Sequence, residues 1–241
     1  MRDTIDFGID LGTTNSAIAV VEEDGGATVI KNNDGWDITP SAVWIPKPGV
    51  VHVGRRARER VQIDPDNAVA EFKLEMGLAD VSKRFVKAGT TLTPPQLSAE
   101  VLRSLRADAA HHSGSPPAAA VITVPAAFSL NQNKATLEAA VQAGLSAACP
   151  LVQEPTAAAF AYGFHDADDR AYWMVFDFGG GTFDAAVVSK RDGDLRVLNH
   201  AGDPYLGGKL IDWAVVERIL APPPQPSSAS PTSAATTRPG G

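Results

Sequence analysis

Short apolar runs alternate with polar turns at the start of the chain. Apolar residues dominate positions 5–10 and 16–21, and the segment 11–15 between them reads Leu-Gly-Thr-Thr-Asn. Two such runs around a glycine-bearing turn are typical of a β-hairpin. Farther along, residues 120–124 are apolar almost throughout and stop at Pro125, which predicts a fully buried strand.

Other stretches place apolar residues at helical spacing or have the residues that begin and end helices. Leu97, Val101 and Leu105 recur on one face of such a stretch. Pro155 follows Glu154, in a first helical turn where a missing N–H is harmless. We predict helices over residues 65–77, 94–111, 130–143 and 154–163. Strands and helices in this mixture predict an α/β fold.

One pattern occurs twice, with its aspartates at positions 10 and 177. Residues 9–14 (Ile-Asp-Leu-Gly-Thr-Thr) align with residues 176–181 (Phe-Asp-Phe-Gly-Gly-Gly), and the valine pairs at 20–21 and 187–188 align as well. The chain therefore repeats a hairpin whose first strand ends in an aspartate. Chance agreement over so few positions is the alternative, and the chemistry that the two copies share argues against it.

Each copy joins its aspartate to a turn rich in glycine and threonine. Glycine lets backbone N–H groups converge on an anion, and threonine hydroxyls add donors, so each turn could cradle a phosphate. Asp10 and Asp177 would repel that phosphate unless a cation lay between them, which implies Mg²⁺ held largely through its waters. The alternative is that Asp-x-Gly is ordinary turn chemistry.

Two further side chains suit phosphate chemistry. Lys73 could steady a transferred phosphoryl group, because electrostatic stabilisation does most of the work in phosphoryl transfer. Alone, it would be an ordinary helix lysine. Glu154 at a helix start could orient a water or the metal, but the helix dipole also favours a carboxylate at this position. The residues alone leave both alternatives open.

Composition narrows the class of protein. The 241 residues are 44% apolar and 20% charged, with a formal net charge of -7, which suits one large or two small globular domains and disfavours nonspecific nucleic-acid binding. The single cysteine, Cys149, fits a reducing compartment. The first six residues lack the basic start and apolar stretch of a secretory signal. We expect a cytoplasmic protein with no membrane span and no nucleic-acid partner.

The end of the chain differs in composition from the rest. Residues 222–241 consist almost entirely of Pro, Ser, Ala, Thr and Gly, with no large apolar side chain to offset the entropy of ordering. We therefore predict a disordered tail from residue 221. Three local features are explained by structure alone. We expect His111 and His112 to lie at a solvated helix end, and the basic run at 55–60 to form a solvated face. We expect Cys149 to be a buried packing residue.

Five ordered motifs together resemble the nucleotide-binding domain of the heat-shock 70 kDa (DnaK-type) chaperones. They are residues 9–16 (IDLGTTNS), 121–128 (VITVPAAF), 154–159 (EPTAAA), 176–184 (FDFGGGTFD) and 201–208 (AGDPYLGG). The resemblance covers about residues 5–220 and implies an actin-like ATPase (ribonuclease H-like) fold, in which two related lobes face each other across a nucleotide cleft. It implies a first lobe at 1–170, complete or slightly trimmed, a partial second lobe at 171–220, and the tail at 221–241.

The resemblance also implies roles for individual residues. Lys73 corresponds to the family's catalytic lysine. Asp10, Glu154, Asp177 and Thr182 correspond to positions that arrange Mg²⁺ and the attacking water, with Asp10 and Asp177 as metal-binding residues. The phosphate-binding positions form two loops, which are Gly12, Thr13, Thr14 and Asn15, and Gly179, Gly180, Gly181 and Thr182. The implied cofactors are ATP or ADP and Mg²⁺.

The sequence departs from the family in three places. The resemblance ends near Leu220, so we expect no counterpart here of the adenine and ribose contacts in the family's second lobe, or of its peptide-binding domain. The segment between Lys73 and Pro125 is shorter than in the family. Asn133 stands where the family has an arginine that helps relay nucleotide state, and Lys134 points about 100° away on the helix.

The motifs and the departures from the family lead to one expected function and one alternative. We expect an ATP-binding, Mg²⁺-dependent ATP-hydrolysing domain of a DnaK-type chaperone that assists protein folding, impaired by truncation, with cochaperones or nucleotide-exchange factors as partners. The alternative is a noncatalytic interaction module, or an incomplete gene product without nucleotide turnover. The motifs at 154–159 and 176–184 disfavour a sugar kinase or a filament-forming relative, which would share the fold.

Overall fold

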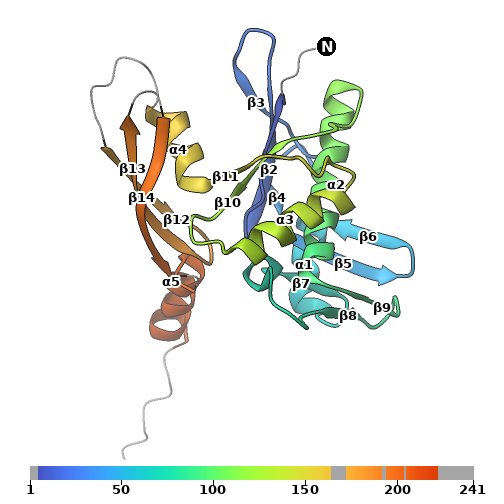
Figure 1. The fold of residues 1–241 in the computed structure, drawn as a ribbon. Helices are drawn as coiled ribbons and strands as arrows, with labels where there is room; N and C mark the ends of the chain where they lie inside the picture. The colour runs from blue at the N-terminus through green and yellow to red at the C-terminus, as the bar shows by residue number, and fades with distance from the viewer. Residues whose placement is uncertain (1–4, 164–171, 192–193, 204, 222–241) are drawn as a thin grey trace, which may run out of the picture.

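The hairpin predicted at the start of the chain is present. The computed structural model (Figure 1) describes residues 5–163, 172–191, 194–203 and 205–221. Strand β1 (Phe7–Asp10) runs antiparallel to β2 (Asn15–Val21), with Ile9 opposite Ile18. Both isoleucines are buried, so one face of the hairpin points into the core.

This hairpin lies inside a six-stranded sheet, the first sheet, with the strand order β11-β10-β1-β2-β3 and with β4 also paired to β2. The other strands are β3 (Ala27–Val29), β4 (Thr39–Pro40), β10 (Val121–Val124) and β11 (Leu151–Gln153). Strand β10 is parallel to both of its neighbours. Its Ile122 and Val124 are buried, which confirms the predicted strand, although Val121 and Thr123 are only partly buried.

Two capped helices pack against each other beside the first sheet. Thr93 begins α2 (Pro94–Ser113) and Ser129 begins α3 (Leu130–Gln142), each in a capping box with the glutamine three residues later. Such a box satisfies N–H groups that a first helical turn leaves free. The apolar face of α2 is buried through Leu97, Val101, Leu102 and Leu105. Both predicted helices are confirmed.

The helix predicted over residues 65–77 is wrong. Ala68–Ala70 form strand β7, which pairs with β5 (Ala42–Lys47). Only Phe72–Glu75 form a helical segment, a single 3-10 turn named η1. The chain in this region therefore changes from a strand to a tight turn within a few residues.

The prediction is wrong because the buried residues between 68 and 76 have the spacing that is typical of a helix. Ala68, Phe72 and Met76 are all buried, and their spacing of four is the spacing of one helical face. The buried Asn67 side chain accepts a hydrogen bond from the Lys87 N–H over 2.7 Å. Because this bond joins segments far apart in sequence, it favours the extended conformation in a way that local spacing does not reveal.

Two smaller sheets and one helix complete this part of the chain. Strands β6-β5-β7 form one sheet and β8-β9 the other. The additional elements are β6 (Val50–Val53), β8 (Lys83–Phe85), β9 (Thr90–Leu92) and α1 (Arg55–Ile63). Most of the basic run in α1 is exposed, as predicted. The guanidinium groups of Arg56 and Arg60 lie 5.6 and 5.0 Å from the ring centre of Trp44.

The repeated hairpin is present in a second, three-stranded sheet. Strands β12 (Tyr172–Phe178), β13 (Phe183–Arg191) and β14 (Asp194–Asp203) run antiparallel in that order. Asp177 pairs with Asp184 in this hairpin, as Asp10 pairs with Ala17 in the first. Residue 10 pairs with residue 17, and the equivalent residue 177 pairs with residue 184, which is equivalent to residue 17. The two hairpins therefore have the same register. The predicted repeat is confirmed.

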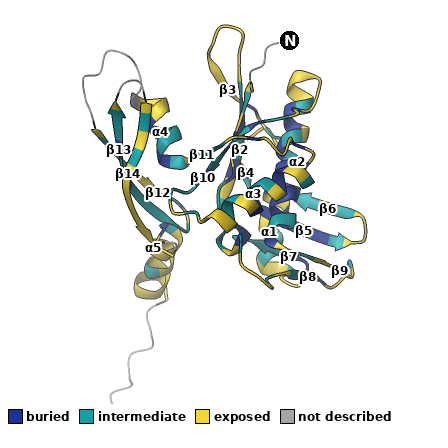
Figure 2. Cartoon of the chain, viewed as in Figure 1, coloured by how far each residue is buried: buried dark blue, intermediate teal, exposed yellow. Residues whose placement is uncertain are grey.

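Helices α4 (Glu154–Gly163) and α5 (Gly208–Val215) accompany the second sheet (Figure 1), and α5 continues into a π-helical turn, η2 (Val216–Leu220). The position of α4 confirms its prediction. Burial differs between the two sheets (Figure 2). The second sheet buries Ala186 and Val188, whereas Tyr172, Met174 and Phe176 along β12 are exposed.

The structure also tests the predictions for Cys149, for the two histidines and for membrane spans. Cys149 is buried, and His111 and His112 are exposed at the end of α2, as predicted. Among the described residues, none of the helices combines the length and apolar character that crossing a bilayer requires. The predicted lobe boundary at residue 170 and, apart from residue 221, the predicted tail at 221–241 lie outside the described residues.

Candidate functional site

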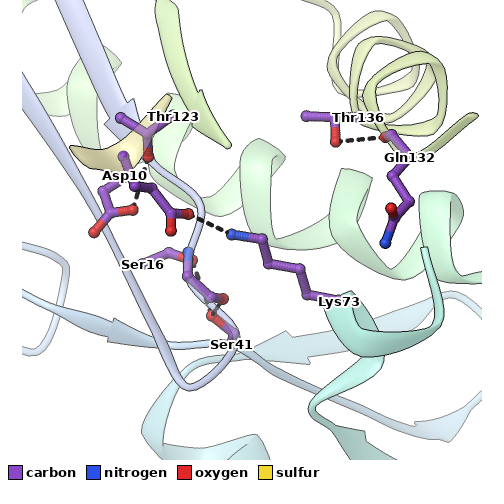
Figure 3. A network of polar contacts seen from close by, with 9 residues as sticks. Asp10, Ser16, Ser41, Lys73, Thr123, Gln132 and Thr136 are labelled. Carbon is purple, nitrogen blue, oxygen red and sulfur yellow. Dashed lines mark hydrogen bonds and ion pairs between the residues drawn. The ribbon is translucent and has the colours of Figure 1, made fainter. Parts of the chain in front are cut away.

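The first glycine turn is held from behind by two serines (Figure 3). The Gly12 N–H donates to Ser16 Oγ over 3.1 Å, and the Ser41 hydroxyl donates to the Gly12 carbonyl over 2.7 Å. The two hydroxyls lie 2.9 Å apart. A Cβ at Gly12 would lie 2.0 Å from the Asn15 carbonyl oxygen, so this turn requires glycine.

The second glycine turn is held by the start of α5. The Gly179 N–H donates to the Thr182 carbonyl over 2.9 Å and closes the turn. The Gly208 and Lys209 N–H groups donate to the carbonyls of Gly179 and Gly180 over 3.0 and 2.9 Å. These bonds fix the turn through its carbonyl groups.

The two turns meet, although they belong to different sheets. A Cβ at Gly180 would lie 2.8 Å from the Thr14 hydroxyl oxygen. The close approach therefore depends on glycine at position 180. Repeated motifs from opposite ends of the chain thus come together in one place.

A cavity of about 800 Å³ lies at this meeting point. Eleven of the twelve predicted site residues line it; Gly181 does not. The lining residues are Asp10, Gly12, Thr13, Thr14, Asn15, Lys73, Glu154, Asp177, Gly179, Gly180 and Thr182. The chain thereby brings both predicted phosphate loops and all the predicted charged residues into one cavity.

Lys73 is a buried cation at this cavity (Figure 3), only 5% exposed. Its Nζ lies 2.8 Å from Glu154 Oε1 and 5.5 Å from the centre of the Phe128 ring. Lys73 lies in η1 and not in an α-helix, so the explanation as an ordinary helix lysine is excluded. A buried lysine needs an anionic partner, and Glu154 supplies one.

Glu154 is the first residue of α4 and is surrounded by charge. Burial raises the pKa of Glu154, Lys73 opposes this rise, and the nearby Asp10 and Asp177 add to it. Glu154 does lie at a helix start, where the helix dipole favours a carboxylate, and it also lines the cavity.

Thr123 and Asp184, for which the sequence predicts no role, belong to the same group of polar side chains. The Thr123 hydroxyl donates to Asp10 Oδ1 over 2.9 Å (Figure 3). Burial raises the pKa of Asp184, the charge of Asp177 adds to the rise, and His200 and Lys73 oppose it. The position of Asp184 opposite Asp177 follows from the hairpin register, which is the signal that could have found it.

These carboxylates fit a cation held mainly by water. Asp10, Asp177, Asp184 and Glu154 all line the cavity, where Lys73 is the buried cation. In the described part of the chain, His, Cys, Asp and Glu side chains form no group of three that could hold a metal directly. Mg²⁺ prefers oxygen ligands and usually keeps several of its waters, so one or two carboxylates suffice for it.

Asn133, where the sequence departs from the family, lies in the first part of α3. The Asn133 side-chain oxygen is buried without a hydrogen-bond partner in the described structure, and Lys134 is exposed. Asn133 does not line the cavity, whereas Gln132 does. That the family's relay of nucleotide state is altered at this position stays a prediction.

The paired hairpins and the cavity between them define the class of the protein, which is an α/β protein of the actin-like ATPase fold. A family model described as Hsp70 protein matches residues 6–223, and the chain belongs to this family. It is 41% identical over 215 residues to the chaperone protein DnaK of Thermotoga neapolitana, and 43% identical over 220 residues to that of Elusimicrobium minutum.

The matches cover most of this chain and a smaller part of its relatives. The alignments cover 87% and 89% of the chain. In both cases they cover 35% of the relative. The chain therefore spans about a third of the length of these curated relatives.

Proposed function

We propose that the chain is a nucleotide-binding domain of a DnaK-type chaperone that binds ATP or ADP with Mg²⁺ and hydrolyses ATP. The observation that supports this most is the meeting of the two glycine turns at a cavity that also holds Lys73 and the carboxylates. In this proposal the first sheet belongs to the first lobe, residues 1–170, and the second sheet to the start of the second lobe, residues 171–220.

The described residues divide the chemistry among them. The two turns would bind phosphate oxygens, and Asp10 and Asp177 would hold the waters of the cation. Mg²⁺, when bound, neutralises charge on the phosphates and so favours attack at phosphorus. Lys73 would stabilise the transferred phosphoryl group.

Glu154 would orient the attacking water. Its carboxylate is fixed by the 2.8 Å ion pair with Lys73, and burial, opposed by Lys73, raises its pKa. A raised pKa brings a carboxylate closer to the range in which it accepts a proton effectively. Thr182, at the second turn, would add a hydroxyl near the same water.

The names of the relatives suggest wider roles, which belong to this proposal. Both are called chaperone protein DnaK, so assistance in protein folding, and contact with cochaperones or nucleotide-exchange factors, are proposed for this chain. A cytoplasmic location, which the single cysteine favours, is proposed as well.

A noncatalytic interaction module is the second candidate. The observation that favours it is the exposure of large apolar side chains on the second sheet and α5, among them Met174, Phe176 and Trp213. Exposed apolar surface of this kind often marks a contact site. The two candidates differ in nucleotide binding and turnover.

Calorimetric titration with Mg·ATP tests the leading proposal. We expect the wild type to bind, and Lys73→Ala to weaken binding by about 10- to 100-fold, because a charged hydrogen bond contributes about 1.5–3 kcal/mol. Asp10→Asn should weaken the dependence of binding on Mg²⁺. The exposed Lys31 offers a matched control, and Lys31→Ala should bind like the wild type.

The titration also has outcomes that contradict the proposal. If the wild type gave the same heats as Lys73→Ala, with both variants folded by circular dichroism, the proposed nucleotide site would be wrong. If Mg·ATP bound but single-turnover assays detected no hydrolysis, and Glu154→Gln changed nothing, the noncatalytic candidate would replace the ATPase.

A further inference from the structure

An ion pair between two residues that do not line the cavity joins its two sides. Lys209 Nζ lies 2.9 Å from both Glu71 Oε1 and Glu71 Oε2. Lys209 belongs to α5, beside the second sheet, whereas Glu71 directly follows β7 on the side of the first sheet (Figure 1). The pair therefore connects segments from opposite sides of the molecule.

Lys209 and Glu71 are each connected directly to a segment that lines the cavity. The Lys209 N–H donates to the Gly180 carbonyl over 2.9 Å, so the lysine that forms the pair also holds the second turn. Glu71 immediately precedes η1, which contains Lys73. A hydrogen bond thus links Gly180 to Lys209, and an ion pair links Lys209 to Glu71. The backbone of η1 then leads from Glu71 to Lys73, which is paired with Glu154.

The backbone at Glu71 is in an uncommon conformation. Its φ of 64° and ψ of 12° lie in the left-handed region, which costs free energy for residues other than glycine. The turn at this residue lets the following Phe72 and Lys73 both be buried. The Glu71 side chain remains 27% exposed and lies against Lys209.

We propose that Glu71 and Lys209 form a latch across the cavity, which holds α5 and the second turn against the segment of Lys73. They act as positioning residues: Glu71 fixes the segment that presents Lys73, and Lys209 fixes the turn that faces it. The effect of the latch on nucleotide rests on the proposed function. Its effect on the separation of the two sides of the cavity does not.

Isolated surface ion pairs contribute little, because ordering two long side chains opposes their attraction. Here the lysine contacts both carboxylate oxygens, and its backbone is already fixed by the second turn, so less freedom is lost. Lys209 is 52% exposed. Salt should therefore weaken the latch, since exposed charges are screened over about 10 Å at 0.1 M ionic strength.

The distance between the two sides of the cavity tests the latch without nucleotide. Spin labels at two exposed positions, Ala107 on α2 and Arg196 on β14, report this distance by pulsed electron resonance. We expect a narrow distribution in the wild type and a broader, longer one in Lys209→Glu and Glu71→Lys. The double variant with both changes should restore the narrow distribution, because it reverses the pair. High salt should broaden the wild-type distribution.

A matched control and a milder variant keep this test decisive. Lys31 and Asp37 form an exposed pair at 2.7 Å on the side of the first sheet, and Lys31→Glu should leave the distribution unchanged. Lys209→Gln removes the charge without repulsion, in case Lys209→Glu fails to fold. The proposal is overturned if the folded single variants keep the wild-type distribution, or if the folded double variant does not restore it.

A Mg·ATP titration of the same variants measures the consequence for the site. We expect each single variant to bind up to about five-fold more weakly, and the double variant to recover, as the energies of exposed pairs suggest. A failure of the wild type to bind contradicts the proposed function and leaves the distance result to decide the latch. Binding that is unchanged in variants with altered distances would refute the positioning role.

Discussion

Among single residues, Asp108 has an unusual environment. It is 3% exposed on α2, and its Oδ1 atom has no hydrogen-bond partner in the described part of the chain. Burial raises the pKa of Asp108 to about 6, Asp34 adds to the rise, and a backbone hydrogen bond from Asn33 and the charge of His111 oppose it. The folded protein therefore holds this proton more tightly than the unfolded chain does.

We predict a pH dependence of stability from this residue. The stability that protonated Asp108 contributes is fully present below about pH 4 and is lost as the pH rises through about 6. Asp108→Asn should match the wild type near pH 4 and exceed it by about 1–3 kcal/mol near pH 8. Urea unfolding at both pH values measures this difference. Asp66→Asn, at an exposed position, should change neither value, and an Asp108→Asn curve parallel to the wild type would contradict the prediction.

Residue types and motifs were enough to predict that Asp10, Lys73 and Glu154 line one cavity. They assigned no role to Thr123 or Asp184, because those contacts depend on how strands pair. Thr123 reaches Asp10 only because β10 lies parallel to β1. A reading of local sequence does not contain that pairing.

At the scale of elements, the junction between α5 and the second turn is tightly packed against backbone atoms. A Cβ at Gly207 would lie 2.6 Å from the Gly181 nitrogen and 2.7 Å from the Gly180 carbonyl carbon. Both of these are backbone atoms, which cannot move aside as a flexible side chain can. At Gly181 itself, an added Cβ would meet nothing within 4 Å.

These two glycines form a matched pair for a stability measurement. Gly207→Ala should lower the free energy of unfolding by about 1–3 kcal/mol, as overpacking does. Gly181→Ala should change it by less than about 0.5 kcal/mol, like an unconstrained surface substitution. Chemical denaturation of both variants makes the comparison. Equal losses in the two variants would show that the junction is not packed as described.

Elements with local signals were predicted best. Apolar spacing identified α2, and the glycine at 144 marked the end of α3, so both signals lie within or next to the helix itself. Strand β7 was mistaken for part of a helix, because its conformation depends on pairing with β5, where Val69 lies opposite Val43. Spacing along the sequence reports burial, and it does not distinguish a buried strand with a tight turn from a buried helix face.

At the scale of the whole molecule, two sheets of unequal burial share one cavity. The first sheet and its helices contain most of the buried core, whereas β12 exposes four large side chains, Tyr172, Met174, Phe176 and Phe178. Two described contacts between the two sides lie at or beside the site: Thr14 against Gly180, and Lys209 with Glu71. A ligand in the cavity should therefore order the two sides together.

Hydrogen exchange with and without Mg·ATP tests most directly the central claim that both turns bind one phosphate chain. The account predicts slower amide exchange at residues 11–15 and at residues 179–182 together, because each turn would contribute N–H groups to the same ligand. Lys73→Ala at the same Mg·ATP concentration should show a smaller effect in both segments. Protection of only one turn, or of neither, would contradict the account.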